Sequence, residues 1–366
     1  MLNNKTIAVV VPAYNEESQI AMVIETMPDF VDRIIIVNDC SKDKTAEIVL
    51  QYIENDTSEK KTITNRLEKQ FKKTKYNRAE EVLHERALKE ETLLHPSVIA
   101  NKSPETDRII LINHTVNGGV GAAIASGYKW CKDHDIDCTA VMAGDGQMDP
   151  DELEGICRPV TDENIDYVKG NRLIHRSAWL VIPRIRYFGN SILSILTKLA
   201  SGYWRVSDTQ TGYTAISNAA LNAIRLYDIY RSYGMPNDML VKLNIAMCTI
   251  REVPIKPIYA VGENSKMKIF KVIPRVSFLL FKSFFKRLWI KYLFRDFHPL
   301  FLLYNFAFIL ILLDIPVIIK IIHYLLSNQS VTFQSIVAFA FFSITGFQSL
   351  LFAMWMDIQD NERLYK

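Results

Sequence analysis

Several features of common protein classes are scarce in this sequence. Its 366 residues include only five cysteines, an odd number without a Cys-x-x-Cys spacing, which excludes a disulfide framework and a thiolate metal site of that type. Residues 1–17 contain an apolar run too short for a secretory signal and no small-residue cleavage site. Both absences predict that the N-terminal part of the chain lies in the reducing cytoplasm.

The sequence also lacks a large net charge and the glycine-rich motif of dinucleotide-binding enzymes. The formal net charge is only +3, and the first half of the chain has no basic stripe interleaved with aromatic residues, which excludes nucleic acid as a partner. No Gly-x-Gly-x-x-Gly follows the first predicted strand, which excludes the common dinucleotide-binding enzymes. The continuous apolar stretches all lie after Pro299, so we expect a folded domain with an apolar appendage.

Short β-branched and apolar runs alternate with helical stretches in the first 150 residues. Strands are predicted at residues 7–11, 33–37, 109–112 and 139–142, with helices at 17–27 and 121–131. This order predicts an α/β domain with a mainly parallel sheet, in which ligands bind beyond the carboxyl ends of the strands. Polar motifs follow each predicted strand end, at residues 12–17, 38–45, 114–121 and 143–150.

The segment at about 53–107 is dense in charge of both signs and contains no glycine. It is predicted to be a helical insertion. Either it is a solvated helical excursion, or it is an arm that contacts a partner or a second copy of the chain, which would make a homo-oligomer.

The C-terminal third has the pattern of a membrane anchor. Residues 265–297 carry a run of Lys and Arg with no Asp or Glu over 266–295, and Arg287, Lys291 and Arg295 recur at four-residue spacing. This predicts basic amphipathic juxtamembrane helices with one face on anionic headgroups.

Residues 298–357 contain two predicted transmembrane helices, at about 299–320 and 331–356, which form a hairpin. The positive-inside rule places the preceding domain and a tail at 358–366 in the cytoplasm, so the chain is predicted to be an integral membrane protein in contact with the lipid bilayer. Asp314 inside the first span either has a function or forms an ordinary pair near Lys320 and His323.

Oxygen-bearing side chains follow the predicted strands. Asp145 and Gln147 lie on a glycine-rich turn and suit Mg²⁺ or Mn²⁺, although an Asp-Gly turn before a helix explains the same residues. Glu16 and Asp39 follow the first two strands and could bind ribose or a base. Gly121, with its neighbouring glycines, permits close backbone approach to a ligand or forms an ordinary turn.

These motifs, in this order and spacing, resemble the family 2 glycosyltransferases, and most closely their dolichyl- or undecaprenyl-phosphate sugar synthase branch, which is dolichol-phosphate mannosyltransferase-like. The matching pieces are VVPAYNEE at 10–17, VNDCSKDKT at 37–45, NGGVGAAIASGY at 117–128, AGDGQMDPDEL at 143–153, KGNR at 169–172, SDTQTGY at 207–213 and SKM at 265–267. The resemblance implies a Rossmann-like GT-A fold for residues 1–264, apart from the insertion.

The resemblance also implies a chemistry: inverting transfer of a sugar from a UDP- or GDP-linked nucleotide-sugar donor to a polyprenyl (undecaprenyl or dolichyl) phosphate, with Mg²⁺ or Mn²⁺. The donor contacts it implies are Pro12, Tyr14, Asn15, Glu16, Asp39, Gly121, Gly144, Asp145 and Lys266. The metal ligands it implies are Asp145 and Gln147. The catalytic residues it implies are Asp145, Asp238, Arg172 and Arg186.

Two positions depart from the family pattern. Ala143 stands where the metal motif often has a first carboxylate, which predicts weaker metal binding, and Cys40 stands where glycine is usual. Two other functions remain open. A transferase that extends a lipid-linked oligosaccharide or polysaccharide could use Asp238 as a base, although the QxxRW signature of processive synthases is absent. A catalytically silent membrane scaffold is consistent with Ala143 but gives no reason for the polar cluster.

Overall fold

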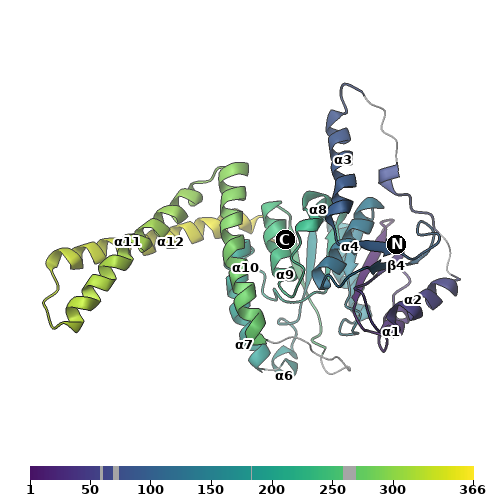
Figure 1. Ribbon diagram of the computed structural model, residues 1–366, viewed down its shortest axis with the longest axis horizontal. Helices are drawn as coiled ribbons and strands as arrows, with labels where there is room; N and C mark the ends of the chain where they lie inside the picture. Colours follow the sequence, from purple (N-terminus) through teal and green to yellow (C-terminus); the bar gives the residue numbers. More distant parts are fainter. Residues whose placement is uncertain (58–60, 69–73, 183, 259–268) are drawn as a thin grey trace.

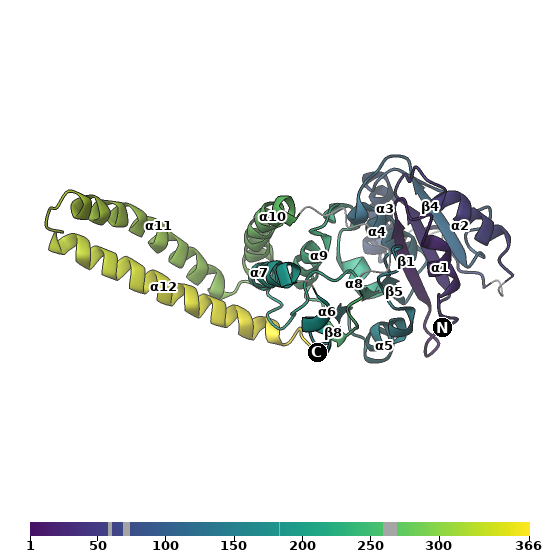
Figure 2. The same ribbon diagram turned by 90° about the horizontal axis from the view of Figure 1, so that it is seen from below.

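The chain forms a sheet-based domain from which a long helical hairpin projects (Figures 1 and 2). The computed structural model describes residues 1–57, 61–68, 74–182, 184–258 and 269–366, without the side chains of 184–188 and 269–272. Lys266 therefore lies outside the described residues.

Eight strands form one sheet in the order β3-β4-β2-β1-β5-β7-β6-β8. Their bounds are β1 Ile7–Ala13, β2 Arg33–Asn38, β3 Ser97–Ile99, β4 Ile109–His114, β5 Cys138–Val141, β6 Tyr167–Asn171, β7 Thr214–Ser217 and β8 Ile250–Pro254. Strands β4, β2, β1 and β5 are parallel, β7 is antiparallel to both β5 and β6, and β8 is parallel to β6. The predicted mainly parallel α/β sheet is confirmed.

Helices cover both faces of the sheet because the central strands are apolar on both sides. On one face the core includes residues of α4 (Val120–Asp133), α8 (Asn218–Ala223) and α9 (Met235–Ile245). The opposite face packs against α1 (Ile20–Glu25), α2 (Thr45–Glu54) and α5 (Leu153–Glu163). Three short 3-10 turns complete this domain: η1 Arg66–Glu68, η2 Pro150–Glu152 and η3 Leu226–Asp228.

The insertion is only partly helical, which corrects the prediction for 53–107. Helix α3 (Arg78–Leu93) projects from the domain (Figure 1), but β3 follows it and pairs antiparallel with β4 at the sheet edge. The β-branched pair Val98 and Ile99 suits this edge position. Glu90 fixes the base of α3, because its carboxylate accepts hydrogen bonds from Lys132 Nζ and the backbone N–H of Leu226.

Three helices lie between the sheet and the hairpin. They are α6 (Ala178–Val181), α7 (Arg184–Ser201) and α10 (Ile269–Trp289), and α10 continues into the π-helical turn η4 (Ile290–Arg295). Helix α10 is amphipathic. However, the prediction that Arg287 and Lys291 face lipid headgroups is wrong, because both side chains are buried. The exposed face of α10 instead carries Arg275, Phe278, Phe281 and Lys282.

The hairpin consists of α11 (Pro299–Leu326) and α12 (Phe333–Glu362). Both helices are long and apolar enough to cross a membrane, with mean hydropathies of 2.4 and 1.9 over their most apolar windows. They extend beyond the predicted ends at 320 and 356, because single polar residues do not interrupt the helical backbone. Asp314 faces the partner helix and accepts a hydrogen bond from Ser343.

The predicted tail at 358–366 is also corrected. Helix α12 continues to Glu362, and the last residues then return to the sheet domain. Leu364 is buried in the core beneath α9, and Tyr365 forms a parallel bridge with Ile250 of β8. The C-terminus is therefore part of the folded domain.

Candidate active site

The loops that carry the motifs meet at one edge of the sheet. Strands β1, β2, β4 and β5 are parallel, so the loops after their carboxyl ends lie side by side. Because β7 is antiparallel to β5 and to β6, the end of β6 and the loop that leads into β7 lie at the same edge. This places Arg172 and the 207–213 loop beside the turn that contains Asp145.

The loops after β1 and β2 are joined by hydrogen bonds between backbone N–H groups and side-chain oxygens. Asn15 Oδ1 accepts from the N–H of Lys42 at 2.8 Å, and the N–H of Asn15 donates to Ser41 Oγ at 3.0 Å. The N–H of Glu16 donates to Thr45 Oγ1 at 3.0 Å. Asn15 therefore shapes the predicted donor-binding loop, and Pro12, Tyr14 and Glu16 lie on or beside it.

The Asp39 carboxylate is buried and directed into the protein. It lies 2.7 Å from His114 Nδ1 and accepts 2.7 Å hydrogen bonds from the N–H groups of Gly118 and Gly119. Burial alone would raise the pKa of Asp39, but these hydrogen bonds hold its pKa below the ordinary value. Its oxygens therefore fix the glycine turn, and the predicted contact of Asp39 with ribose or base stays a prediction.

Gly121 also has a role within the protein. Its N–H donates to the carbonyl of Arg231, and an added Cβ would collide with the carbonyl oxygen of Tyr230. The glycine that was predicted to allow approach of a ligand thus allows approach of the 230–231 backbone. Cys40 has φ +60°, which lies in the left-handed region that favours glycine.

The turn after β5 presents the candidate metal ligands. Asp145 Oδ1 accepts from the N–H of Gln147 at 3.1 Å, and Gly146 has φ +71°, so the turn needs this glycine. Both the carboxylate and the amide offer hard oxygen atoms, which Mg²⁺ and Mn²⁺ prefer. The donor set fits such an ion with few protein ligands, and Ala143 adds none. Gly144 packs against the carbonyl of Pro12.

A second group of metal-type side chains lies nearby. One ligand atom each from Asp39, His95 and His114 falls within 4.8 Å of the others. His114 Nε2, however, lies 2.9 Å from Ser126 Oγ, and His95 Nε2 contacts the carbonyl of Val116. These polar atoms already have protein partners, so the group fits a hydrogen-bonded structural cluster better than an ion site.

Arg172 and Asp208 form a two-point ion pair at the site. Arg172 Nε and Nη2 lie 2.8 and 3.0 Å from the two carboxylate oxygens of Asp208. Burial opposes the charged carboxylate, yet Arg172 and Lys169 hold the pKa of Asp208 below its ordinary value. Arg172 itself keeps 23% of its side chain exposed, so it remains accessible from the site.

Two charged residues beneath this pair were missed by the sequence analysis. Lys169 is fully buried on β6, donates to the carbonyl of Thr211, and has its pKa lowered to about 8 by burial. Glu252 on β8 accepts hydrogen bonds from the N–H groups of Ser207 and Asp208. The available signal was a lysine inside an otherwise buried strand, and Lys169 and Glu252 together hold the 207–213 loop.

The two remaining catalytic candidates have different outcomes. The Asp238 carboxylate lies near the start of α9, where its Oδ2 pairs with Lys242 and accepts from the N–H of Tyr230 at 2.8 Å. Its role as a base stays a prediction. Arg186 lies in α7, and its side chain is outside the described part of the chain.

The carboxyl edge of the sheet thus brings the Asp145 turn and the Arg172–Asp208 pair together, in a mainly parallel α/β domain of the kind predicted for the GT-A fold. Residues 8–80 and 96–225 match the family described as glycosyl transferase family 2. The match covers more than half of the chain, which therefore belongs to glycosyl transferase family 2. The gap in the match coincides with most of helix α3, in the insertion.

Named relatives agree with the resemblance. A UDP-N-acetylglucosamine--dolichyl-phosphate N-acetylglucosaminyltransferase of Methanococcus voltae is 28% identical over 257 residues, or 70% of this chain and 87% of that protein. A dolichyl-phosphate beta-glucosyltransferase of Trichomonas vaginalis is 24% identical, over 77% of this chain and 74% of that protein. The predicted similarity to the dolichyl-phosphate branch is confirmed.

A solved structure is also similar. Glucosyl-3-phosphoglycerate synthase of M. tuberculosis has a TM-score of 0.46 and 17% sequence identity to this chain, covering 78% of this chain and 81% of that one. The enzyme class of the present chain rests on its family match, which makes it a glycosyltransferase.

Proposed function

We propose that the protein is an inverting glycosyltransferase that moves a sugar from a UDP- or GDP-linked donor to a polyprenyl phosphate carrier at the cytoplasmic face of a membrane. One observation carries the proposal: the acidic Asp145 turn and the cationic Arg172 meet at the carboxyl edge of the sheet, in a chain that also has an apolar hairpin. The similarity to two dolichyl-phosphate transferases supports the acceptor class.

The donor would lie along the loops after β1, β2 and β5. Pro12, Tyr14 and Glu16 would contact the nucleotide, with Asn15 holding their loop in shape. Asp39, which fixes the adjoining glycine turn, would hold the ribose or base at the same place. Gly144 would allow close approach of the diphosphate at the Asp145 turn, and Lys266 would add a cation beside it.

A divalent ion would be held by Asp145 and Gln147. When bound, Mg²⁺ or Mn²⁺ supplies positive charge that stabilises the departing nucleoside diphosphate. The single carboxylate predicts modest affinity for the free ion.

The acceptor chemistry suits Arg172, with Arg186 as a second proposed cation. A phosphate monoester is anionic at neutral pH, so its oxygen can form the bond to the anomeric carbon as the bond to the diphosphate breaks on the opposite face. This in-line displacement inverts the anomeric configuration. Arg172 would offset the repulsion between the two phosphate groups, because its guanidinium is aimed by Asp208.

The hairpin would place the reaction at the bilayer. Only 22% and 17% of the residues in the apolar windows of its two helices are buried. A bilayer would cover the remaining apolar surface. Exposed Arg275 and Lys282 of α10 would favour anionic headgroups on the cytoplasmic side.

The proposal is tested with the full-length protein in detergent, undecaprenyl or dolichyl phosphate, Mg²⁺ or Mn²⁺, and a panel of labelled UDP- and GDP-sugars. We expect label in the lipid phase only with the ion present. Asp145→Ala should reduce transfer by about 100-fold or more, because several kcal/mol of charge stabilisation are lost. Ala143→Asp should lower the ion concentration needed for half-maximal transfer.

Asp29→Ala is the matched control, since Asp29 is an exposed carboxylate before β2 and thus at the opposite sheet edge. It should transfer sugar like the wild type. Full activity of Asp145→Ala would contradict the assigned metal site, and absence of lipid-linked label with every donor would favour the scaffold instead.

A further inference from the structure

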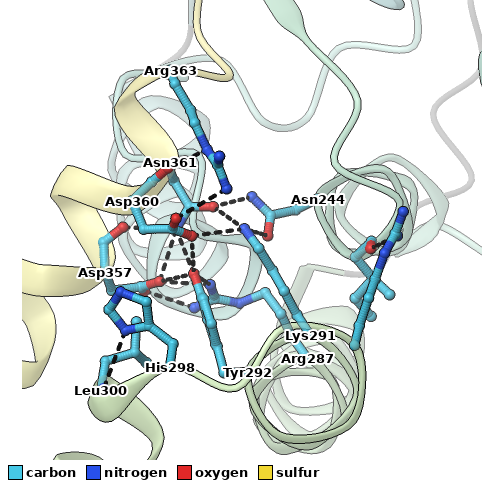
Figure 3. Close-up of polar contacts among 12 residues, drawn as sticks. Asn244, Arg287, Lys291, Tyr292, His298, Leu300, Asp357, Asp360, Asn361 and Arg363 are labelled. Atoms are coloured by element: carbon cyan, nitrogen blue, oxygen red, sulfur yellow. Dashed lines mark hydrogen bonds and ion pairs between the residues drawn. The ribbon is translucent and has the colours of Figure 1, made fainter.

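A dense group of polar side chains lies where the hairpin joins the sheet domain (Figure 3). We call it the junction cluster. It comprises Asn244 of α9, Arg287 of α10, Lys291 and Tyr292 of η4, and Asp357, Asp360 and Asn361 of α12. Its members come from both sides of the hairpin, so it joins segments about 70 residues apart in the chain.

Arg287 is the centre of the junction cluster. Its Nη1 and Nη2 both lie 2.7 Å from the carboxylate of Asp357, and these side chains are only 1% and 0% exposed. Its other N–H groups donate to Tyr292 Oη and to the carbonyls of Leu199 and Ala200 at the end of α7. All five N–H donors of the guanidinium are thus used to connect α7, η4 and α12.

Lys291 makes a second connection, to α9. Its Nζ lies 3.1 Å from Asn244 Oδ1, 2.6 Å from Asn361 Oδ1 and 3.2 Å from Asp360 Oδ2. Asn244 Nδ2 also donates to Asn361 Oδ1 at 2.7 Å. An unpaired charge at Arg287 or Lys291 would lower the stability of the fold, because water is excluded from both side chains.

The chain beyond the junction cluster is fixed as well. The N–H of Ile250 donates to the carbonyl of Leu364 at 2.7 Å, and the N–H of Lys366 donates back to Ile250 at 3.0 Å. Gly202 leaves room for the Arg287 guanidinium, since an added Cβ would lie 2.5 Å from Arg287 Nη1. The second helix of the hairpin and the segment that precedes the first are therefore attached to the sheet domain by buried contacts.

Helix α9 extends from the junction cluster to the candidate active site. Asn244 lies near its C-terminal end, while Asn237 near its start accepts hydrogen bonds from Thr197 and from Gln210 of the 207–213 loop. Helix α9 therefore links the hairpin to the active-site edge, so the junction cluster fixes where this edge lies relative to the hairpin.

We propose that the junction cluster sets the height and tilt of the active-site edge above the bilayer, so that Arg287, Lys291 and Asp357 are positioning residues for an acceptor embedded in the membrane. The inference rests on the proposed function. It predicts a selective defect: loss of the cluster should impair transfer to a carrier anchored in a bilayer and spare transfer to a short acceptor that diffuses in water.

The test uses the full-length protein in liposomes and two acceptors, a long-chain polyprenyl phosphate in the bilayer and a short water-soluble prenyl phosphate. For Asp357→Asn and Lys291→Gln we expect kcat/KM on the bilayer acceptor to fall by about tenfold or more, because small displacements of reacting groups cost this much. The soluble acceptor should change by less than about twofold. The double variant Arg287→Met/Asp357→Leu keeps an apolar contact and serves if Asp357→Asn does not fold.

Lys286→Gln is the matched control, because Lys286 adjoins Arg287 on α10 but forms a half-exposed pair with Asp228. It should retain activity on both acceptors. Equal losses on the two acceptors, or no loss on either, would overturn the positioning role while leaving the proposed function intact. A wild-type protein that glycosylates neither acceptor would overturn both.

Discussion

The Asp208 carboxylate is almost completely buried, and its charge is stable only because cations surround it. Arg172 contacts both of its oxygens, and the fully buried Lys169 adds a second positive charge. At the scale of single residues, the active-site edge thus depends on charges that compensate one another beneath the surface. The same arrangement fixes the orientation of the Arg172 guanidinium.

Asp208→Asn should destabilise the protein by about 3 kcal/mol at pH 7, because Arg172 and Lys169 lose their buried partner. The folded-state pKa of Asp208 is lowered, so the wild type gains this stability above the unfolded-state pKa of about 3.9 and loses it as the pH falls. The variant should therefore show a shallower loss of melting temperature between about pH 5 and pH 3. Melting of the detergent-solubilised protein, followed by intrinsic fluorescence, measures this.

Asp29→Asn provides the comparison, since this exposed carboxylate has no described ion pair. It should follow the wild-type pH dependence. An identical acid profile for Asp208→Asn and the wild type would show that the ion pair contributes nothing to stability.

At the scale of elements, the start of helix α4 is fixed by contacts between backbones. Gly119 and Gly121 lie against the carbonyls of Arg231 and Tyr230, and the adjacent turn is held by Asp39. Helix α4 can approach the 230–231 segment only because these positions lack a Cβ. This contact also aligns α4 with the start of α9.

Gly121→Ala should lower the free energy of unfolding by about 1–3 kcal/mol, the usual effect of overpacking. Gly155→Ala in α5 is the matched control, because an added Cβ there meets nothing within 4 Å, and the better helix propensity of alanine should stabilise by up to about 1 kcal/mol. Thermal or denaturant unfolding of both variants and the wild type measures these changes in stability. If Gly121→Ala and Gly155→Ala changed the free energy of unfolding equally, the 230–231 backbone would move aside without loss of stability.

At the scale of the whole molecule, the hairpin is not a separable anchor. The junction cluster and residues 364–366 join its second helix to the sheet domain. The elongated shape in Figures 1 and 2 therefore contains one continuous set of buried contacts at its centre.

A chain ended after residue 297 should be unstable even in detergent. Arg287 and Lys291 would be left without Asp357 and Asn361, at a cost of about 3–5 kcal/mol for the broken ion pair. Removal of 364–366 alone should cost less, about 2 kcal/mol, because the burial of the Leu364 side chain is lost. The melting temperature and the size-exclusion elution volume of each shortened chain measure these effects. If the shortened chain melted like the full-length protein, the hairpin would be an independent anchor.

The order of elements could be predicted from the sequence because it is written in local patterns. β-branched runs specified β1, β2, β4 and β5, and uninterrupted apolar stretches specified α11 and α12. The location of the candidate site followed as well, since loops after parallel strands must share one edge. Single sequence runs thus contained the information for the strands, the two long apolar helices and the Asp145 turn.

The partners of the charged side chains were decided only by the tertiary structure. Asp39 binds His114 across 75 residues, Arg172 binds Asp208 across 36, and Arg287 binds Asp357 across 70. Four-residue spacing showed that Arg287 and Lys291 share a helix face, but not whether lipid or protein covers that face. Periodicity fixes a direction around a helix axis, whereas the neighbour in that direction depends on how distant segments pack.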